Sequence, residues 1–159
     1  MNFKVVFTDY YYPNNDQEIK ILNQLKDVEI IDCTKIKKGG LKKEEEFINY
    51  VKDADAIIVQ TAKISKKTIE KLTKCKIICR YAIGVDNIDV EEAKKRNIIV
   101  SNVPEYCIEE VSNTAIALLF YCLRKIGIAN HSLRKNMWSY DKIYPIHRLS
   151  TLTLGLIFW

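Results

Sequence analysis

The residues best suited to bind a small anion are Arg80 to Asp89, which read Arg-Tyr-Ala-Ile-Gly-Val-Asp-Asn-Ile-Asp. This segment leaves an apolar run, turns at Gly84 and enters a helix-like stretch. Such a turn presents successive backbone N–H groups, and the N-terminus of the following helix adds a partial positive charge. The arrangement suits a carboxylate or a phosphate. A plain strand-to-helix turn would show the same pattern, since glycine is common in turns.

Two histidines are the other candidates for chemistry. His131 falls late in a long helix-like stretch, and His147 lies in a loop beside Arg148. General acid–base catalysis needs a group positioned against its substrate as well as a suitable pKa. We expect both histidines to be surface or linker residues.

The cysteines form no Cys-x-x-Cys pair and no cluster with histidine, so we expect no metal site. An odd number of cysteines, several within apolar runs, indicates buried thiols in a reducing compartment. The run after Met1 is too short for a signal peptide. The longest apolar stretch, Ala115 to Leu123, is far shorter than the ~20 residues that span a bilayer. We therefore expect a cytoplasmic protein without a membrane partner.

Composition argues against several other classes of protein. The chain has 159 residues, 48% hydrophobic and 28% charged, which fits one ordinary domain plus an extension and not a disordered chain. The net charge of +5 comes mostly from lysine doublets interspersed with acidic residues, which is typical of a solvated surface. A nucleic-acid interface would combine arginine and aromatic residues on one face, and only five arginines occur. We expect no nucleic-acid partner.

The elements that must position the Gly84 turn alternate between strand and helix. Apolar runs separated by amphipathic helices favour a parallel sheet with helices on both faces. We predict an α/β domain, a flavodoxin-like doubly wound parallel five-stranded sheet in the order 2-1-3-4-5. Ser65 is expected to cap the third helix, and Asp89 with Glu92 to form a capping box for the fourth. The predicted strands are Lys4–Thr8, Val28–Asp32, Ala56–Gln60, Lys76–Arg80 and Ile98–Ser101, and the predicted helices are Asp16–Lys26, Leu41–Lys52, Ser65–Lys74 and Asp89–Arg96.

The pattern changes after Pro104. Tyr106 to about Asn136 contains no proline and predicts one long helix, apolar on most sides between Val111 and Ile128. Such a helix must be covered on nearly all sides. We therefore expect an interdomain helix, followed by a loop at residues 137–150.

The C-terminal residues predict one further strand. Thr151 to Trp159 first alternates and then becomes continuously apolar, like the first strand of a new βαβ unit. A dinucleotide-binding domain would continue it into a glycine-rich turn and a helix N-terminus. Phe158 and Trp159 stand where that turn should begin. We expect a fragment: residues 1–104 as a substrate-binding domain, 105–150 as interdomain helix and linker, and 151–159 as the truncated start of an NAD-binding Rossmann domain.

Four motifs in this order resemble the D-isomer-specific 2-hydroxyacid dehydrogenases, in detail the phosphoglycerate dehydrogenase and C-terminal-binding-protein branches. The motifs are Arg80–Asp89, Ile99–Pro104, Glu109–Ala115 and Leu152–Ile157, and the resemblance covers essentially the whole chain. It implies an NAD-dependent oxidoreductase acting on the CH–OH group of a D-2-hydroxy acid. In such enzymes the nicotinamide supplies the hydride chemistry, and the protein supplies orientation, a base and charge stabilisation.

The resemblance also implies roles for individual residues. Ile83 and Gly84 would hold the substrate carboxylate through main-chain N–H groups, and Thr61 and Ala62 would face the substrate. Thr114, together with Ile83, would approach the nicotinamide end of NAD. The catalytic Arg, Glu and His of the family would lie beyond residue 159, so we expect this chain alone to be inactive.

Two positions depart from the family pattern. Ala82 replaces a common glycine. Gln60 stands where relatives that bind phosphorylated substrates often have arginine, which argues against a phosphorylated substrate.

The implied partners are a small 2-hydroxy or 2-oxo acid and a second copy in a homodimer whose usual interface is largely missing. The alternative to an enzyme is an NAD-sensing, corepressor-like regulatory protein or a non-functional remnant. Two other folds with this topology are excluded. A receiver domain needs an aspartate where the third strand ends in Gln60 and Thr61, and a flavodoxin needs a hydroxyl-rich phosphate loop where Asp9 is followed by tyrosines.

Overall fold

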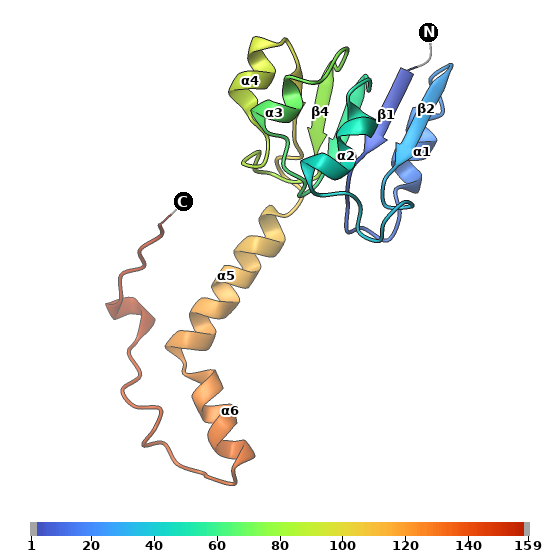
Figure 1. The fold of residues 1–159 in the computed structure, drawn as a ribbon. Coiled ribbons are helices and arrows are strands. Elements are labelled where there is room, and N and C mark those ends of the chain that lie inside the picture. The colour runs from blue at the N-terminus through green and yellow to red at the C-terminus, as the bar shows by residue number, and fades with distance from the viewer. Residues whose placement is uncertain (1–2, 158–159) are drawn as a thin grey trace. The chain divides into compact units, whose positions relative to one another are not determined.

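A computed structural model describes residues 3–157 (Figure 1). The chain divides into two compact units, Met1–Tyr106 and Cys107–Trp159. The first unit contains five strands and four helices, and the second contains two helices and a 3-10 turn. In chain order the elements are β1 (Phe3–Phe7), α1 (Asp16–Leu22), β2 (Val28–Asp32), α2 (Glu44–Val51), β3 (Ala56–Val59), α3 (Lys66–Ile69), β4 (Ile77–Arg80), α4 (Val90–Lys95), β5 (Ile99–Ser101), α5 (Ile108–Leu123), α6 (Ile126–Arg134) and η1 (Leu149–Thr151).

The five strands form one parallel sheet in the order β2-β1-β3-β4-β5, which confirms the predicted fold class and strand order. Each strand begins and ends within one residue of its predicted bounds. Val5 of β1 pairs with Ile30 on one side and Ala56 on the other. Because all strands run in the same direction, their carboxyl ends meet at one edge of the sheet, where ligands bind in folds of this type.

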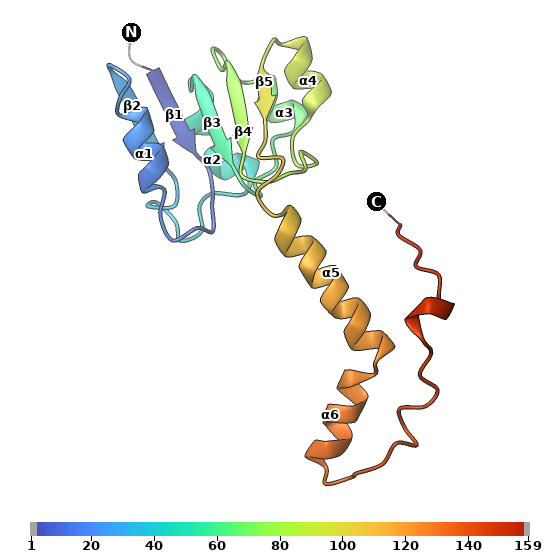
Figure 2. The same ribbon diagram turned by 180° about the vertical axis from the view of Figure 1, so that it is seen from behind.

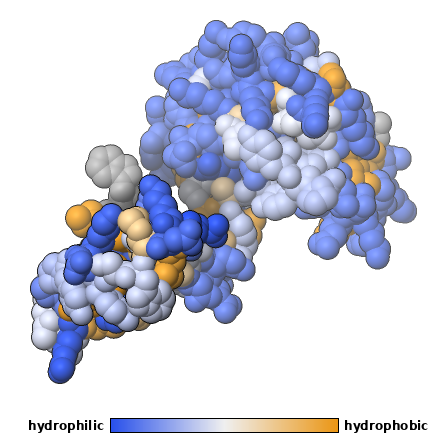
Figure 3. Space-filling view, turned by 90° about the horizontal axis from the view of Figure 1, so that it is seen from below, coloured by the Kyte–Doolittle hydropathy of each residue, from blue (hydrophilic) through white to orange (hydrophobic). Residues whose placement is uncertain are grey.

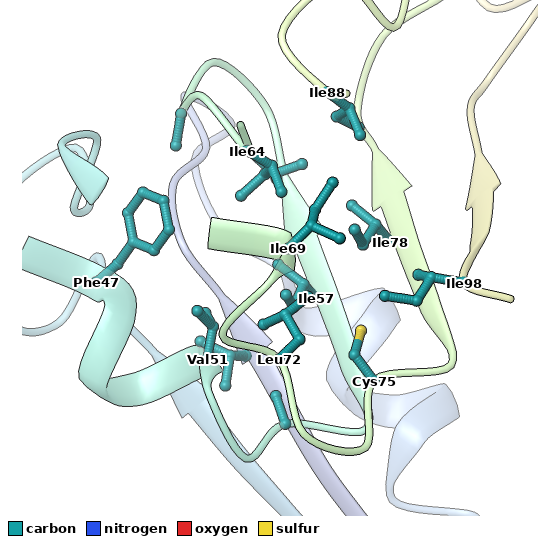
Figure 4. Packing of buried hydrophobic residues seen from close by; sticks show 14 of the residues in the cluster. Phe47, Val51, Ile57, Ile64, Ile69, Leu72, Cys75, Ile78, Ile88 and Ile98 are labelled. Carbon is teal, nitrogen blue, oxygen red and sulfur yellow. The ribbon is translucent and has the colours of Figure 1, made fainter. Parts of the chain in front are cut away.

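The core lies between the sheet and the three helices α2, α3 and α4, which Figure 1 shows in front of the strands. Figure 4 shows Ile69 of α3 beside Ile57 and Ile78 of the sheet, whereas Phe47 of α2 belongs to the same cluster further along, and all four side chains are fully buried. Burial of each contributes about 1.5–3 kcal/mol. Helix α1 covers the opposite face beside β2 and β1 (Figure 2), whereas Ile99 of β5 remains 63% exposed. The packed face fixes the positions at which the strands end.

The predicted helix caps are formed only in part. Asp89 accepts a hydrogen bond from the Glu92 N–H at 3.0 Å, as predicted, but the Asp89 N–H donates to the Ile64 carbonyl and so no reciprocal box forms. The prediction that Ser65 caps α3 is confirmed only in position, because its side chain forms no capping hydrogen bond. Ser65 occupies the N-cap position, but its hydroxyl and its N–H both donate to the Glu44 carboxylate, at 2.5 and 3.0 Å. An ionised acceptor forms stronger hydrogen bonds than a neutral one, so the hydroxyl turns away from its own helix.

The prediction of one long helix after Tyr106 is wrong. Helices α5 and α6 are bent by 62° at a break where Lys125 adopts the left-handed conformation, with φ 51°. No residue of α5 is buried, so no packing holds the helix straight across the break. A Cβ at Gly127 would lie 2.3 Å from the Tyr121 hydroxyl oxygen, so a larger residue here would require the Tyr121 ring to move.

The strand expected from Leu152 is absent from the described residues, which end at Ile157. Residues 152–157 have no regular secondary structure, and Phe158 and Trp159 lie outside the described part. A strand needs a neighbour that pairs with its backbone N–H and C=O groups, and among residues 3–157 no strand lies beside this segment. Leu154, Leu156 and Ile157 are exposed, and Figure 3 shows apolar side chains at the surface of this unit.

Among residues 3–157 no single helix has the length and apolar character to cross a membrane. Helices α5 and α6 meet the length and composition criteria only as a bent pair.

Candidate functional site: the carboxyl edge of the sheet

The site is built from three loops at the carboxyl edge of the first unit. They follow β1, β3 and β4, the three central strands of the sheet. In Figures 1 and 2 the arrows of these strands point to one edge, where the loops converge. The sheet therefore brings together residues that are about 50 positions apart in the chain.

The loop after β4 presents unpaired backbone donors. The Tyr81 N–H still pairs with the Val59 carbonyl at 2.9 Å, and the Ile88 N–H donates to the Val85 carbonyl at 2.9 Å. Within residues 3–157, the four N–H groups of residues 82–85 have no acceptor. We call these groups the N–H row. Ile83 and Gly84, the two residues expected to hold a carboxylate, both lie in it and are exposed. Successive free N–H groups of this kind form an anion-binding surface.

Neighbouring side-chain and backbone groups brace the N–H row. The Arg80 Nη1 donates to the Asp86 Oδ1 at 2.5 Å, and this ion pair lowers the pKa of the Asp86 carboxyl. The Asn102 amide donates to the Ile83 carbonyl at 2.6 Å, and the Val103 N–H donates to the Ala82 carbonyl at 3.1 Å. Because these carbonyls are engaged, the peptide units of the row have a defined orientation.

Gly84 leaves little room for a side chain. A Cβ there would lie 3.0 Å from the Asp86 Oδ1 and 3.5 Å from the Arg80 Nη1. Any larger residue would press on the ion pair that braces the row.

The loop after β3 turns its donors inwards. The Thr61 N–H and hydroxyl donate to the Asp9 Oδ2 at 2.8 and 2.7 Å, and the Ala62 N–H donates to the Asp9 Oδ1 at 3.2 Å. Ala62 is fully buried, whereas Thr61 is exposed. The two residues expected to face the substrate therefore lie at the right edge, but their hydrogen-bond donors are already used by Asp9. Asp9 was not among the predicted site residues, and its signal in the sequence is an acidic residue directly after an apolar strand.

Asn87 joins the loops after β3 and β4. Its amide nitrogen donates to the Ala62 carbonyl at 2.7 Å and to the Gln60 carbonyl at 3.4 Å. A groove of about 340 Å³, lined by residues 63–66 and 86–89, runs between the two loops. This groove, lined by both polar and apolar residues, lies beside the N–H row.

A cluster of tyrosines lies at the same edge. The Tyr81 ring makes edge-to-face contacts with Tyr12 and Tyr10, with centroids 5.6 and 6.5 Å apart. Burial raises the pKa of the Tyr81 phenol, and the Glu18 carboxylate adds to the rise, so this phenol stays neutral. The run of three tyrosines after the first strand was the available signal for this aromatic surface.

The Gln60 side chain links two loops of this edge. Its side-chain carbonyl accepts the Tyr11 N–H at 2.7 Å, which ties the loop after β1 to the loop after β3. The Lys42 ammonium group contacts the Tyr11 hydroxyl and lowers the pKa of that phenol. The Lys42 ammonium group therefore places a positive charge beside these loops, although Gln60 itself is neutral.

The remaining candidates lie in the second unit. Thr114 is exposed on α5, His131 is exposed on α6, and His147 is exposed in the following loop. In the described part of the chain neither histidine side chain forms a hydrogen bond or an ion pair, and no group of His, Cys, Asp and Glu could hold a metal ion. The described residues also contain no strand, glycine-rich turn and helix of the kind that holds a pyrophosphate, since Gly155 lies in the irregular segment.

Known proteins resemble this chain in sequence and in structure. It is 36% identical over 155 residues to a D-3-phosphoglycerate dehydrogenase of Methanocaldococcus jannaschii, covering 97% of this chain and 27% of the relative. It is 32% identical to a glyoxylate reductase of Thermococcus litoralis, covering 96% and 46%. The chain thus spans less than half the length of these relatives.

Solved structures of known proteins also resemble this chain. An acyclic imino acid reductase in complex with NADPH and D-Arg is 30% identical with a TM-score of 0.74, covering 89% of this chain and 44% of that one. An NAD+-bound 3-phosphoglycerate dehydrogenase from Entamoeba histolytica is 29% identical with a TM-score of 0.63, covering 79% and 40%. The family model described as D-isomer specific 2-hydroxyacid dehydrogenase, catalytic domain, matches residues 5–151. The chain belongs to the D-isomer-specific 2-hydroxyacid dehydrogenase family.

Proposed function

We propose that this chain is the substrate-binding part of an NAD-dependent oxidoreductase that acts on the CH–OH group of a D-2-hydroxy acid. Residues 1–104 would form the substrate domain, 105–150 the interdomain helix and linker, and 151–159 the start of the NAD-binding domain. The observation that carries the proposal is the N–H row of residues 82–85, which has no acceptor among residues 3–157 and lies at the carboxyl edge of the sheet.

The proposed binding mode starts from the carboxylate. The N–H groups of Ile83 and Gly84 donate to it, and their orientation is fixed in advance by the bonds that Ala82 and Ile83 accept through their carbonyls. Arg80 is neutralised by Asp86, so the backbone dipoles supply the attraction. Thr61 and Ala62 would form a wall beside the bound acid and would not donate to it. A 2-oxo or 2-hydroxy group would then project from the row towards the cofactor.

NAD, when bound, supplies the hydride chemistry. Thr114 and Ile83 are the residues of this chain that we propose to approach its nicotinamide end. Since the described residues form neither a dinucleotide site nor a positioned acid–base pair, we propose that this chain alone transfers no hydride and that activity needs further protein. A homodimer is part of the same proposal.

We further propose a cytoplasmic location, supported by the cysteines. All five are free thiols, and burial raises the pKa of Cys33 and of Cys75 to about 11. Such thiols are weak nucleophiles at neutral pH and suit a reducing compartment.

The test is a titration of the ¹⁵N-labelled chain with pyruvate, followed by ¹H–¹⁵N NMR. The amides of residues 82–85 should shift, and uncharged methyl pyruvate should leave them unchanged. Gly84→Val should abolish the shifts, since its side chain displaces the Arg80–Asp86 pair. Gly155→Val is the matched control, because a Cβ at Gly155 meets no atom within 4 Å.

Two results would contradict the proposal. Unchanged chemical shifts of the amides of residues 82–85 at high pyruvate concentration would favour the alternative that the protein is a non-functional remnant. NADH consumption by the purified chain with any 2-oxo acid would disprove its inactivity.

A further inference from the structure

Asp9 is a fully buried carboxylate that forms no ion pair within the described residues. It accepts five hydrogen bonds, from the Thr8 hydroxyl, the Gln60 N–H, the Thr61 N–H and hydroxyl, and the Ala62 N–H. A buried charge is costly unless hydrogen bonds satisfy it. Four of the five donors belong to the loop after β3, more than 50 residues away. The buried Asp9 carboxylate therefore fixes the conformation of that loop through four hydrogen bonds.

The peptide unit between Gln60 and Thr61 connects Asp9 to side chains of the loop after β4. Its N–H points at the Asp9 Oδ2, at 2.8 Å. In a planar trans peptide the carbonyl points the opposite way, and the Gln60 carbonyl accepts the Arg80 Nε at 3.2 Å and the Asn87 amide at 3.4 Å. The orientation set by Asp9 thus provides the acceptor for two side chains of the next loop.

Those two side chains flank the N–H row. Arg80 comes just before residues 82–85 and Asn87 just after, and Arg80 also holds Asp86. Contacts at both ends keep a short loop in one conformation. The chain of contacts runs from Asp9 through the Gln60–Thr61 peptide to Arg80 and Asn87, and so to the N–H row.

We propose that Asp9 is a positioning residue for the carboxylate-binding loop of this protein, an inference that rests on the proposed function. Asp9 does not touch the substrate. It fixes the loop after β3, which holds the N–H row in a conformation ready to bind. Binding that needs no reordering of a loop is tighter, because no ordering entropy is lost on association.

The test compares Asp9→Asn with Asp32→Asn. In Asp9→Asn the shape is kept, but an NH₂ group faces the two donors of Thr61. Asp32 is the matched control, because it is also a buried carboxylate of this unit and accepts from Tyr10, Asn15 and Thr34, away from the loop after β3.

Ligand-free ¹⁵N NMR gives the first measurement. Asp9→Asn should shift the side-chain resonances of Arg80 Nε and Asn87 Nδ2 and lower the order parameters of residues 82–85, whereas Asp32→Asn should leave all of them unchanged. Unchanged resonances and order parameters in Asp9→Asn would overturn the proposal. If that variant does not fold, Thr61→Val, which removes a single donor, should show the same changes at smaller amplitude, and their absence would overturn the proposal equally.

Pyruvate titration gives the second measurement. Loss of preorganisation should raise the Kd of Asp9→Asn about tenfold, the equivalent of one lost hydrogen bond, with the Kd of Asp32→Asn unchanged. Equal Kd values in wild type and Asp9→Asn would contradict the positioning role. If the wild type does not bind pyruvate but the ligand-free changes occur, the proposed function fails while the positioning of the row by Asp9 stands.

Discussion

Gly40→Ala should destabilise the first unit strongly, and the structure gives the reason. Gly40 has φ +82°, and a Cβ there would lie 2.4 Å from the Thr8 carbonyl oxygen and 2.5 Å from the Asp9 Cα. Both are backbone atoms at the end of β1, so no side-chain rotation can relieve the overlap. The next N–H, that of Leu41, donates to the same Thr8 carbonyl at 2.8 Å, which holds the two segments together.

The magnitude is the sum of two costs. A left-handed conformation costs an alanine roughly 1–2 kcal/mol. Forcing an extra methyl group into a packed site costs about 1–3 kcal/mol more. We therefore expect Gly40→Ala to lower the free energy of unfolding by about 2–5 kcal/mol.

Gly39→Ala is the matched control. Gly39 has nearly the same backbone conformation, φ +81°, but a Cβ there meets no atom within 4 Å. It should cost only the conformational part, about 1–2 kcal/mol. Urea denaturation followed by far-UV circular dichroism measures both variants. Equal losses in the two variants would refute the argument that the backbone of Thr8 and Asp9 leaves no room at Gly40.

Three further predictions concern pH, thiols and association. Burial opposes ionisation of Glu44, but hydrogen bonds from Ser65 and Thr68 outweigh it and lower the pKa of its carboxyl. Its stabilising contribution is therefore fully present above the unfolded pKa of about 4.3 and is lost as the pH falls through the lower folded pKa. Over this pH range the urea midpoint should fall less in Glu44→Gln than in the wild type, and the rest of the fall comes from other carboxyls with lowered pKa values, such as Asp86. Ellman's reagent should modify the exposed Cys122 at once, and Cys33 and Cys75 only after unfolding; equally fast reaction of all thiols would contradict their burial. The exposed apolar residues of α5 and of residues 152–157 should cause self-association that decreases in a chain ending near Asn136; a clean monomer of the full chain in sedimentation velocity would exclude it.

The sheet was predictable because its signals are local. Each strand is a short apolar run between turn or helix signals, and parallel connections follow a small set of topologies. The Gly84 turn was predictable for the same reason, since a glycine between a strand and a helix marks a loop with free N–H groups. The predictions of one long helix and of a C-terminal strand were wrong, because the conformation of these segments depends on their neighbours. The helix is bent at Lys125, and the segment from Leu152 is unpaired.

The sequence by itself therefore determined the α/β class, the strand order and the loop at Ile83 and Gly84. Only the tertiary structure decided where the polar groups of that edge direct their hydrogen bonds. Asp9 and Thr61 are 52 residues apart, and nothing in the local pattern indicates that their groups meet. Their pairing arises because parallel strands place their carboxyl ends side by side, where a buried carboxylate accepts the nearest donors at whatever distance in the chain they lie.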